Sequence, residues 1–293
     1  MKKNYVGRAV ALILASMLVL NTSAKSKQKY LWERVGVCAD LSDASIIAKG
    51  GGHHVEINLN EMLMPEKSDA DFAANKLAIS QCAVPVLSTN CFFPGGIHLT
   101  GPEADIEKAL RYTEVALRRA SEVGIRLTVL GSSGARNIPE GFSPEKAREQ
   151  FIEFLKRAAP IAKKYHIVIA VEPLRRAESN FINTVKEGYE IAKEVGHPNV
   201  KVNADIFHMM QEGESPQSII DAGKKYIAHV HIAENARRTP PGTDGDDFTP
   251  YFKALKQIGY KGNISIECGW EDMDSQVAPA ISEVKRQLKL AFF

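Results

Sequence analysis

Four short apolar segments in the second half of the chain each end in a residue that can bind a metal ion. The four residues are Glu172, Asp205, His231 and Glu267. Three carboxylates and an imidazole that meet in apolar surroundings repel one another unless a cation compensates their charge. A divalent cation is the simplest compensation, so the set predicts a site for one divalent metal ion.

The ligand types narrow the choice of metal. An oxygen-rich set without a thiolate favours Mn²⁺, with Mg²⁺, Co²⁺ or Zn²⁺ as alternatives. An octahedral ion held by four protein ligands keeps two positions open, which a carbonyl and an adjacent hydroxyl of a sugar can fill. The ion polarises that carbonyl, and a carboxylate base can then remove the neighbouring proton through an enediolate. The sequence therefore predicts proton-transfer chemistry on a sugar.

A regular alternation of strand-like and helix-like segments positions these residues. Strands are expected at 35–39, 55–58, 84–89, 126–131, 167–173, 201–206, 228–233 and 263–268. Helices are expected at 42–49, 68–80, 103–123, 144–165, 182–195, 216–225, 247–259 and 275–290. Eight such units favour an α/β fold with a single (β/α)8 TIM barrel, whose active site forms at the carboxyl ends of the strands. No G-x-G-x-x-G follows the first strand, which argues against a dinucleotide enzyme.

The places of two acids on this barrel suggest separate roles. Glu172 ends the fifth strand and Glu267 the eighth, so the two side chains approach the barrel axis from nearly opposite sides. An epimerase needs one acid on each face of a planar enediolate, since one removes the proton and the other returns it. Glu172 and Glu267 are therefore the expected catalytic residues. Asp40, Glu56 and Asn90 end the first three strands, and the sequence does not rank them.

Three motifs in this half of the chain resemble those of the ketose 3-epimerases, the D-tagatose and D-psicose 3-epimerase group. They are Glu172-Pro-Leu-Arg-Arg-Ala-Glu178, Asp205-Ile-Phe-His208 as D-x-x-H, and His231-Ile-Ala-Glu-Asn-Ala-Arg237 as H-x-x-E-x-x-R. The resemblance covers essentially the whole chain after residue 24 and implies a xylose-isomerase-like barrel with epimerase or isomerase activity. It implies the metal ligands Glu172, Asp205, His231 and Glu267, and a substrate-binding shell of Glu178, His208 and Arg237.

Two features depart from this group and keep a second reading open. Strand eight continues as Glu267-Cys268-Gly269-Trp270 rather than Glu-Pro-Phe, and the chain begins with a leader. The alternative is a metal-dependent lyase or hydrolase that cleaves 3-keto-glycosides and is similar to C-glycoside deglycosidases. The leader favours this alternative, and the intact H-x-x-E-x-x-R motif favours the epimerase. A non-catalytic sugar-binding protein is disfavoured because all four ligands are present.

The first 24 residues follow the pattern of a secretory signal peptide. Lys2, Lys3 and Arg8 precede an apolar run at 9–20, and small residues follow at 22–24. The run is too short to span a membrane. We therefore expect a catalytic domain at 25–293 that is exported to the periplasm or secreted and has no stable membrane anchor.

The composition points to a small-molecule partner. The 293 residues are 44% hydrophobic and 25% charged, and the formal net charge of +2 gives no basic excess for nucleic acid. A carbohydrate substrate is the expected partner, and homo-oligomerisation stays open.

His53 and His54 follow three glycines and are expected in an exposed turn. Free, buried thiols are expected at Cys38, Cys82, Cys91 and Cys268.

Overall fold

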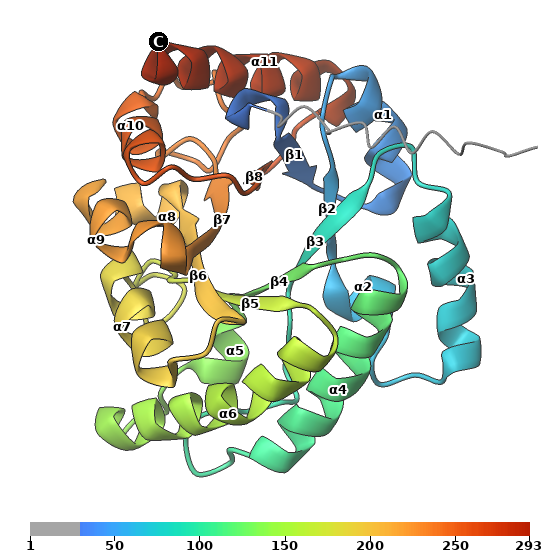
Figure 1. The fold of residues 1–293 in the computed structure, drawn as a ribbon, viewed down its shortest axis with the longest axis vertical. Helices are drawn as coiled ribbons and strands as arrows, with labels where there is room; N and C mark the ends of the chain where they lie inside the picture. The colour runs from blue at the N-terminus through green and yellow to red at the C-terminus, as the bar shows by residue number, and fades with distance from the viewer. Residues whose placement is uncertain (1–29) are drawn as a thin grey trace, which may run out of the picture.

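The computed structural model describes residues 30–293, so the predicted signal peptide at 1–24 lies outside the described residues. Eight parallel strands close into a barrel in chain order, as Figure 1 shows, which confirms the predicted (β/α)8 barrel. The strands are β1 (Val35–Cys38), β2 (Val55–Asn58), β3 (Val86–Asn90), β4 (Leu127–Leu130), β5 (Val168–Val171), β6 (Val200–Asp205), β7 (Ile227–Ile232) and β8 (Ile264–Ile266). β8 pairs with β1 and closes the ring.

A layer of helices surrounds the strands. It consists of α1 (Ala44–Lys49), α3 (Asp69–Ser80), α4 (Ile106–Glu122), α6 (Pro144–Lys164), α7 (Val185–Val195), α9 (Gln217–Tyr226), α10 (Thr249–Gln257) and α11 (Met273–Phe292). Local sequence signals determine where several of these helices begin or end. The Ser143 side chain accepts a hydrogen bond from the Lys146 amide before α6, where Pro144 is the first residue. Gly196 ends α7 with φ 68°.

Short helical segments accompany this framework, and the sequence pattern did not predict them as separate elements. They are the 3₁₀ turns η1 (Leu31–Glu33) and η2 (Leu41–Asp43) and the helices α2 (Leu59–Leu63), α5 (Ser133–Arg136) and α8 (Ile206–Gln211). The three helices follow β2, β4 and β6, so they lie on the carboxyl side of the barrel. They are too short for an apolar periodicity to develop.

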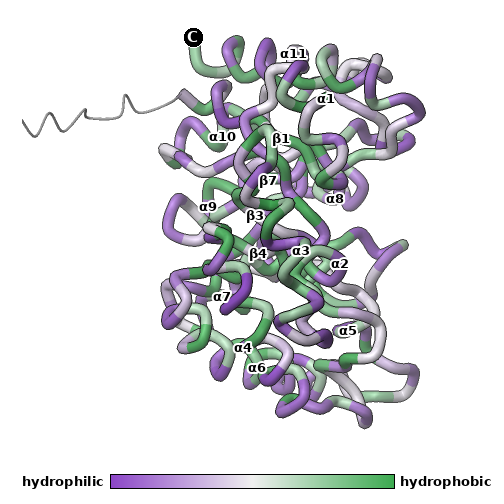
Figure 2. The backbone as a smooth tube through the Cα atoms, turned by 90° about the vertical axis from the view of Figure 1, so that its right-hand side faces the viewer, coloured by the Kyte–Doolittle hydropathy of each residue, from purple (hydrophilic) through white to green (hydrophobic). Residues whose placement is uncertain are grey.

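The strand pleat divides apolar from polar side chains. Val230 and Ile232 of β7 are buried among the apolar core residues, and Ile264 and Ile266 of β8 follow the same alternation. Figure 2 shows green hydrophobic residues interrupted by purple polar ones along the central strands. Fully burying such a side chain contributes about 1.5–3 kcal/mol. The intervening residues point to the barrel axis, where buried polar side chains gather.

Two sequence expectations outside the site can also be compared with the structure. None of the helices in residues 30–293 combines the length and apolar character that crossing a membrane would need. Cys91 is exposed and the other three cysteines are half-buried, whereas we expected buried thiols.

Candidate metal and active site

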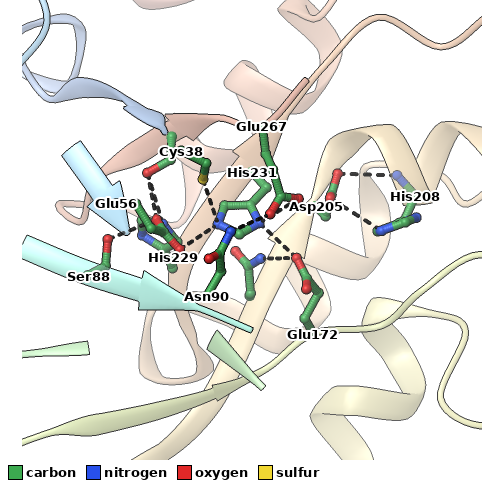
Figure 3. Close-up of polar contacts among 12 residues, drawn as sticks. Cys38, Glu56, Ser88, Asn90, Glu172, Asp205, His208, His229, His231 and Glu267 are labelled. Carbon is green, nitrogen blue, oxygen red and sulfur yellow. Dashed lines mark hydrogen bonds and ion pairs between the residues drawn. The ribbon is translucent and has the colours of Figure 1, made fainter. Parts of the chain in front are cut away.

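The four predicted ligands converge at the carboxyl ends of β5 to β8. Glu172, Asp205, His231 and Glu267 each offer one ligand atom, and these atoms all lie within 4.8 Å of one another. Nδ1 of His231 is 2.8 Å from Oε1 of Glu172 and 3.4 Å from Oε2 of Glu267. Figure 3 shows both glutamates on the Nδ1 side of the His231 ring, with Glu267 above and Glu172 below.

Amide side chains from two other strands of the barrel hold the two glutamates. Nδ2 of Asn203 on β6 donates a hydrogen bond of 2.7 Å to Oε1 of Glu172. Nδ2 of Asn90 on β3 donates one of 2.9 Å to Oε1 of Glu267. Each glutamate therefore has one oxygen bonded to an amide. Asn90 was unranked in the sequence, and only its place at a strand end pointed to it.

Gly131, which follows β4, leaves the space that the Glu172 carboxylate occupies. A Cβ at Gly131 would lie 2.2 Å from Oε2 of Glu172. The buried Arg136 holds the adjacent backbone, since its Nη2 donates to the Glu172 carbonyl at 2.8 Å and its Nε to the Gly131 carbonyl at 2.9 Å. Burial lowers the pKa of Arg136 to about 10, and the charges of Glu172 and Glu187 oppose that shift.

Asp205 gives the clearest sign that the site fits a cation. Its Oδ1 accepts a hydrogen bond of 3.2 Å from the His208 amide at the start of α8. Its Oδ2 is buried and has no hydrogen-bond partner within residues 30–293, and the same holds for Nε2 of His208, 3.5 Å away. A buried carboxylate oxygen without a donor is costly, and a cation shared with the neighbouring acids would satisfy it. The donor set therefore fits a divalent metal ion.

Two adjacent arginines lie differently from our expectation. Arg237, expected in the substrate-binding shell, is 61% exposed in its side chain and pairs with Asp244 at 2.6 Å. Arg238 points into the site instead, and its Nη2 lies 2.5 Å from Oε2 of Glu267. Its Nη1 is 3.6 Å from Oε1 of Glu178, which is thus beside the site as expected. The structure therefore brings Glu178 and His208, but not Arg237, to the ligand set.

Comparison with known proteins identifies the family of this barrel. Residues 44–290 match the family model described as xylose isomerase-like TIM barrel. The chain belongs to this family. D-psicose 3-epimerase of Ruminiclostridium cellulolyticum is 30% identical over 174 residues, 58% of this chain and 59% of that relative. L-ribulose 3-epimerase of Methylomonas sp. is 35% identical over 128 residues, 43% of this chain and 44% of that relative. The alignments thus span about half the length of these curated relatives.

Solved structures agree with the family assignment at the level of the fold. A crystal structure of D-psicose 3-epimerase in the presence of D-fructose has a TM-score of 0.74 at 23% identity and covers 88% of this chain and 96% of that chain. The 3-keto-D-glucoside 4-epimerase of E. coli has a TM-score of 0.71 at 22% identity, covering 86% and 98%. The xylose isomerase-like architecture is therefore confirmed.

Opposite charges balance one another in this xylose isomerase-like site when no ion is bound. Burial disfavours the charged form of His231, but Glu267, Glu56 and Glu172 raise its pKa well above the ordinary value. Burial also opposes the charge of Glu267, yet His231 and Arg238 lower the pKa of this carboxyl. Two cationic side chains thus neutralise acids that could otherwise bind a metal cation.

Glu56 is a second functional candidate, besides Asn90, that the sequence left unranked. It lies on β2, is fully buried, and its Oε1 is 3.0 Å from Nε2 of His231. The pattern Val55-Glu56-Ile57-Asn58 placed Glu56 on the inner face of its strand, but the sequence could not show that β7 lies across the barrel from it.

Proposed function

We propose that this protein is a divalent-metal-dependent epimerase or isomerase of sugars. The observation that carries the proposal is the buried Oδ2 of Asp205, which accepts no hydrogen bond within residues 30–293 and lies among converging acids and His231. The names of the aligned relatives support it, because they include D-psicose 3-epimerase, L-ribulose 3-epimerase and the hydroxypyruvate isomerase of E. coli.

Glu172, Asp205, His231 and Glu267 would hold the ion, with Mn²⁺ as the first candidate and Mg²⁺, Co²⁺ or Zn²⁺ as alternatives. A divalent ion bound there supplies Lewis acidity toward a substrate carbonyl. Glu172 and Glu267 then act as acid and base, because Figure 3 shows one below and the other above the Nδ1 side of the His231 ring and each has one oxygen held by an amide. One removes the proton beside the carbonyl and the other returns it on the opposite face.

Substrate hydroxyls would meet His208, Glu178 and Arg238. Nδ1 of His208 accepts a hydrogen bond from the Arg175 amide, so Nε2 carries the hydrogen. This nitrogen is buried without a hydrogen-bond partner in the described chain and can donate to a sugar oxygen. Arg238 is held over the Phe207 ring at 4.8 Å and lies beside Glu267, so we assign to it the role that the resemblance gives to Arg237. Nε1 of Trp270, also buried without a partner there, offers a further donor at the rim.

We also propose that residues 1–24 direct export and that 25–293 form the mature catalytic domain. An exported enzyme would meet free sugars or glycosides rather than phosphorylated intermediates. Mass spectrometry of the protein recovered from the periplasm or the medium would test this, because cleavage after residue 24 gives a defined mass. An N-terminus before residue 24 in the mature protein would contradict it.

The activity is tested by incubating the Mn²⁺-loaded protein in D₂O with ketohexoses and, in parallel, with a 3-keto-glycoside, while NMR follows both. Deuterium at C3 together with the epimer supports the two-base epimerase. Release of an aglycone without epimer formation would replace it by the lyase alternative. Binding without turnover of either substrate would instead indicate a sugar-binding protein.

A further inference from the structure

A fourth acid lies behind His231, on the side away from the ligand set. Glu56 of β2 is fully buried, and Figure 3 shows it across the His231 ring from Glu172 and Asp205. Its Oε1 is 3.0 Å from Nε2 of His231. Three more donors approach its Oε2, namely Nε2 of His229 at 2.7 Å, Oγ of Ser88 at 2.8 Å and Oγ of Ser265 at 2.8 Å.

We propose that Glu56 is a positioning residue that fixes the tautomer and the orientation of His231. A neutral imidazole carries its hydrogen on only one of its two nitrogens. An ionised carboxylate can only accept, so the nitrogen that faces Glu56, Nε2, must carry the hydrogen. Nδ1, whose own hydrogen faces Glu172 when no ion is bound, is then the nitrogen that gives up its proton and offers a lone pair to an ion held with Glu172 and Glu267. This inference rests on the proposed metal site.

The surroundings of Glu56 keep it ionised. Four donors converge on its two oxygens, and a carboxylate that accepts several hydrogen bonds favours its charged form.

Ser265 connects Glu56 to a further histidine by one hydrogen bond. Its hydroxyl donates to Glu56 and lies 3.0 Å from Nε2 of His54. Burial lowers the pKa of His54 to about 3, so this ring is neutral and can donate to the hydroxyl. The negative charge of Glu56 is thus supported from two sides, and it also makes His231 a more basic ligand.

The affinity of the full-length protein for Mn²⁺, measured by titration calorimetry, tests the proposal. Glu56→Gln keeps the size of the side chain but removes its charge, and we expect a loss of about 10- to 100-fold in affinity. Ser88→Ala is the matched control, because it removes one donor to Glu56 and leaves the carboxylate and its contact with His231. The control should lose less than about threefold.

A second measurement needs no variant and therefore does not depend on the folding of Glu56→Gln. In Zn²⁺-loaded protein with ¹⁵N-labelled histidine, NMR should place the His231 hydrogen on Nε2. A hydrogen on Nδ1, or wild-type affinity in Glu56→Gln, would overturn the positioning role while leaving the metal site intact. Failure of the wild-type protein to bind Mn²⁺ or Zn²⁺ would refute the metal site, and the positioning role with it.

Discussion

Gly131→Ala is a small change that should disable the site while leaving the barrel folded. The added methyl would lie 2.2 Å from Oε2 of Glu172 and 3.6 Å from Cδ2 of Leu174. A normal contact is about 3.5 Å, so the carboxylate must retreat by about 1 Å. Oε1 of the same carboxylate bonds Asn203 at 2.7 Å and His231 at 2.8 Å, and both contacts would lengthen.

The consequences for stability and for activity differ in size. The clash involves the end of a side chain rather than the backbone, so the free energy of unfolding should fall by no more than about 1–3 kcal/mol. A misplacement of about 1 Å at a reacting group can cost about 100-fold in rate. We therefore expect a loss of about 100-fold in kcat for a protein that still unfolds cooperatively.

Gly134→Ala is the matched control, because its added methyl meets no atom within 4 Å. Both variants are compared with the wild type by thermal unfolding, by Mn²⁺ titration and by deuterium incorporation from D₂O. The control should match the wild type in all three. If Gly131→Ala keeps both the affinity and the rate, Glu172 is not confined as the structure places it, and its assignment as ligand and base is refuted.

Three further predictions concern the charged groups of the site. Glu172→Gln and Glu267→Gln should each lower epimerisation at least about 100-fold, because each removes one acid–base group; full activity of either variant in the D₂O assay contradicts the two-base assignment. Arg237→Ala should change kcat/KM less than about threefold, since exposed ion pairs contribute only about 0–1 kcal/mol. Arg238→Ala should lower kcat/KM at least about tenfold. A larger loss in Arg237→Ala than in Arg238→Ala would return the substrate-binding role to Arg237. Mn²⁺ affinity should rise with pH above the ordinary His value of 6.5, because the raised pKa of His231 keeps a proton on the ring that must leave before an ion binds; calorimetry at several pH values that shows a constant affinity would remove His231 from the ligand set.

The fold was predictable because the strand and helix periodicities in the sequence follow the eight β/α units of the barrel. β2 was predicted at 55–58 and observed there, and α6 differs from its prediction by one residue. The inward-facing acids and histidine were predictable for the same reason, since successive residues of a strand point alternately toward the barrel axis and toward the helices. Short elements such as α8 were not predicted, because helix termini and single turns show little periodicity in the sequence.

His54 marks the limit of local sequence reasoning. Its three preceding glycines predicted an exposed turn, but the side chain is fully buried and bonds Ser265. Gly36 of β1 makes room for it, since a Cβ there would lie 2.4 Å from the His54 ring. The sequence gives no sign that Gly36 of β1 and Ser265 of β8 meet His54 just before β2, so the burial could not be predicted.

The adjacent arginines show a second limit. Motif spacing selected Arg237, but Arg238 has a positive φ of 53°, which changes the direction of the chain after β7. In a loop, unlike a strand, position in the sequence does not determine which side chain faces the site. The prediction therefore located the loop correctly and selected the wrong one of two neighbours to lie beside the ligand set.

His231 joins two groups of polar side chains that the barrel stacks along its axis. Nδ1 faces Glu172 and Glu267, and Nε2 faces the fully buried Glu56. On β2, Glu56 alternates with Val55 and Ile57, which belong to the apolar core, so this polar residue is accommodated without loss of apolar packing. The buried charges are tolerated because donors surround Glu56 and because a proton or a metal ion can balance the acids beyond His231. A change on the Glu56 side therefore reaches the ion through the imidazole, so we expect it to alter metal affinity more than the binding of substrate.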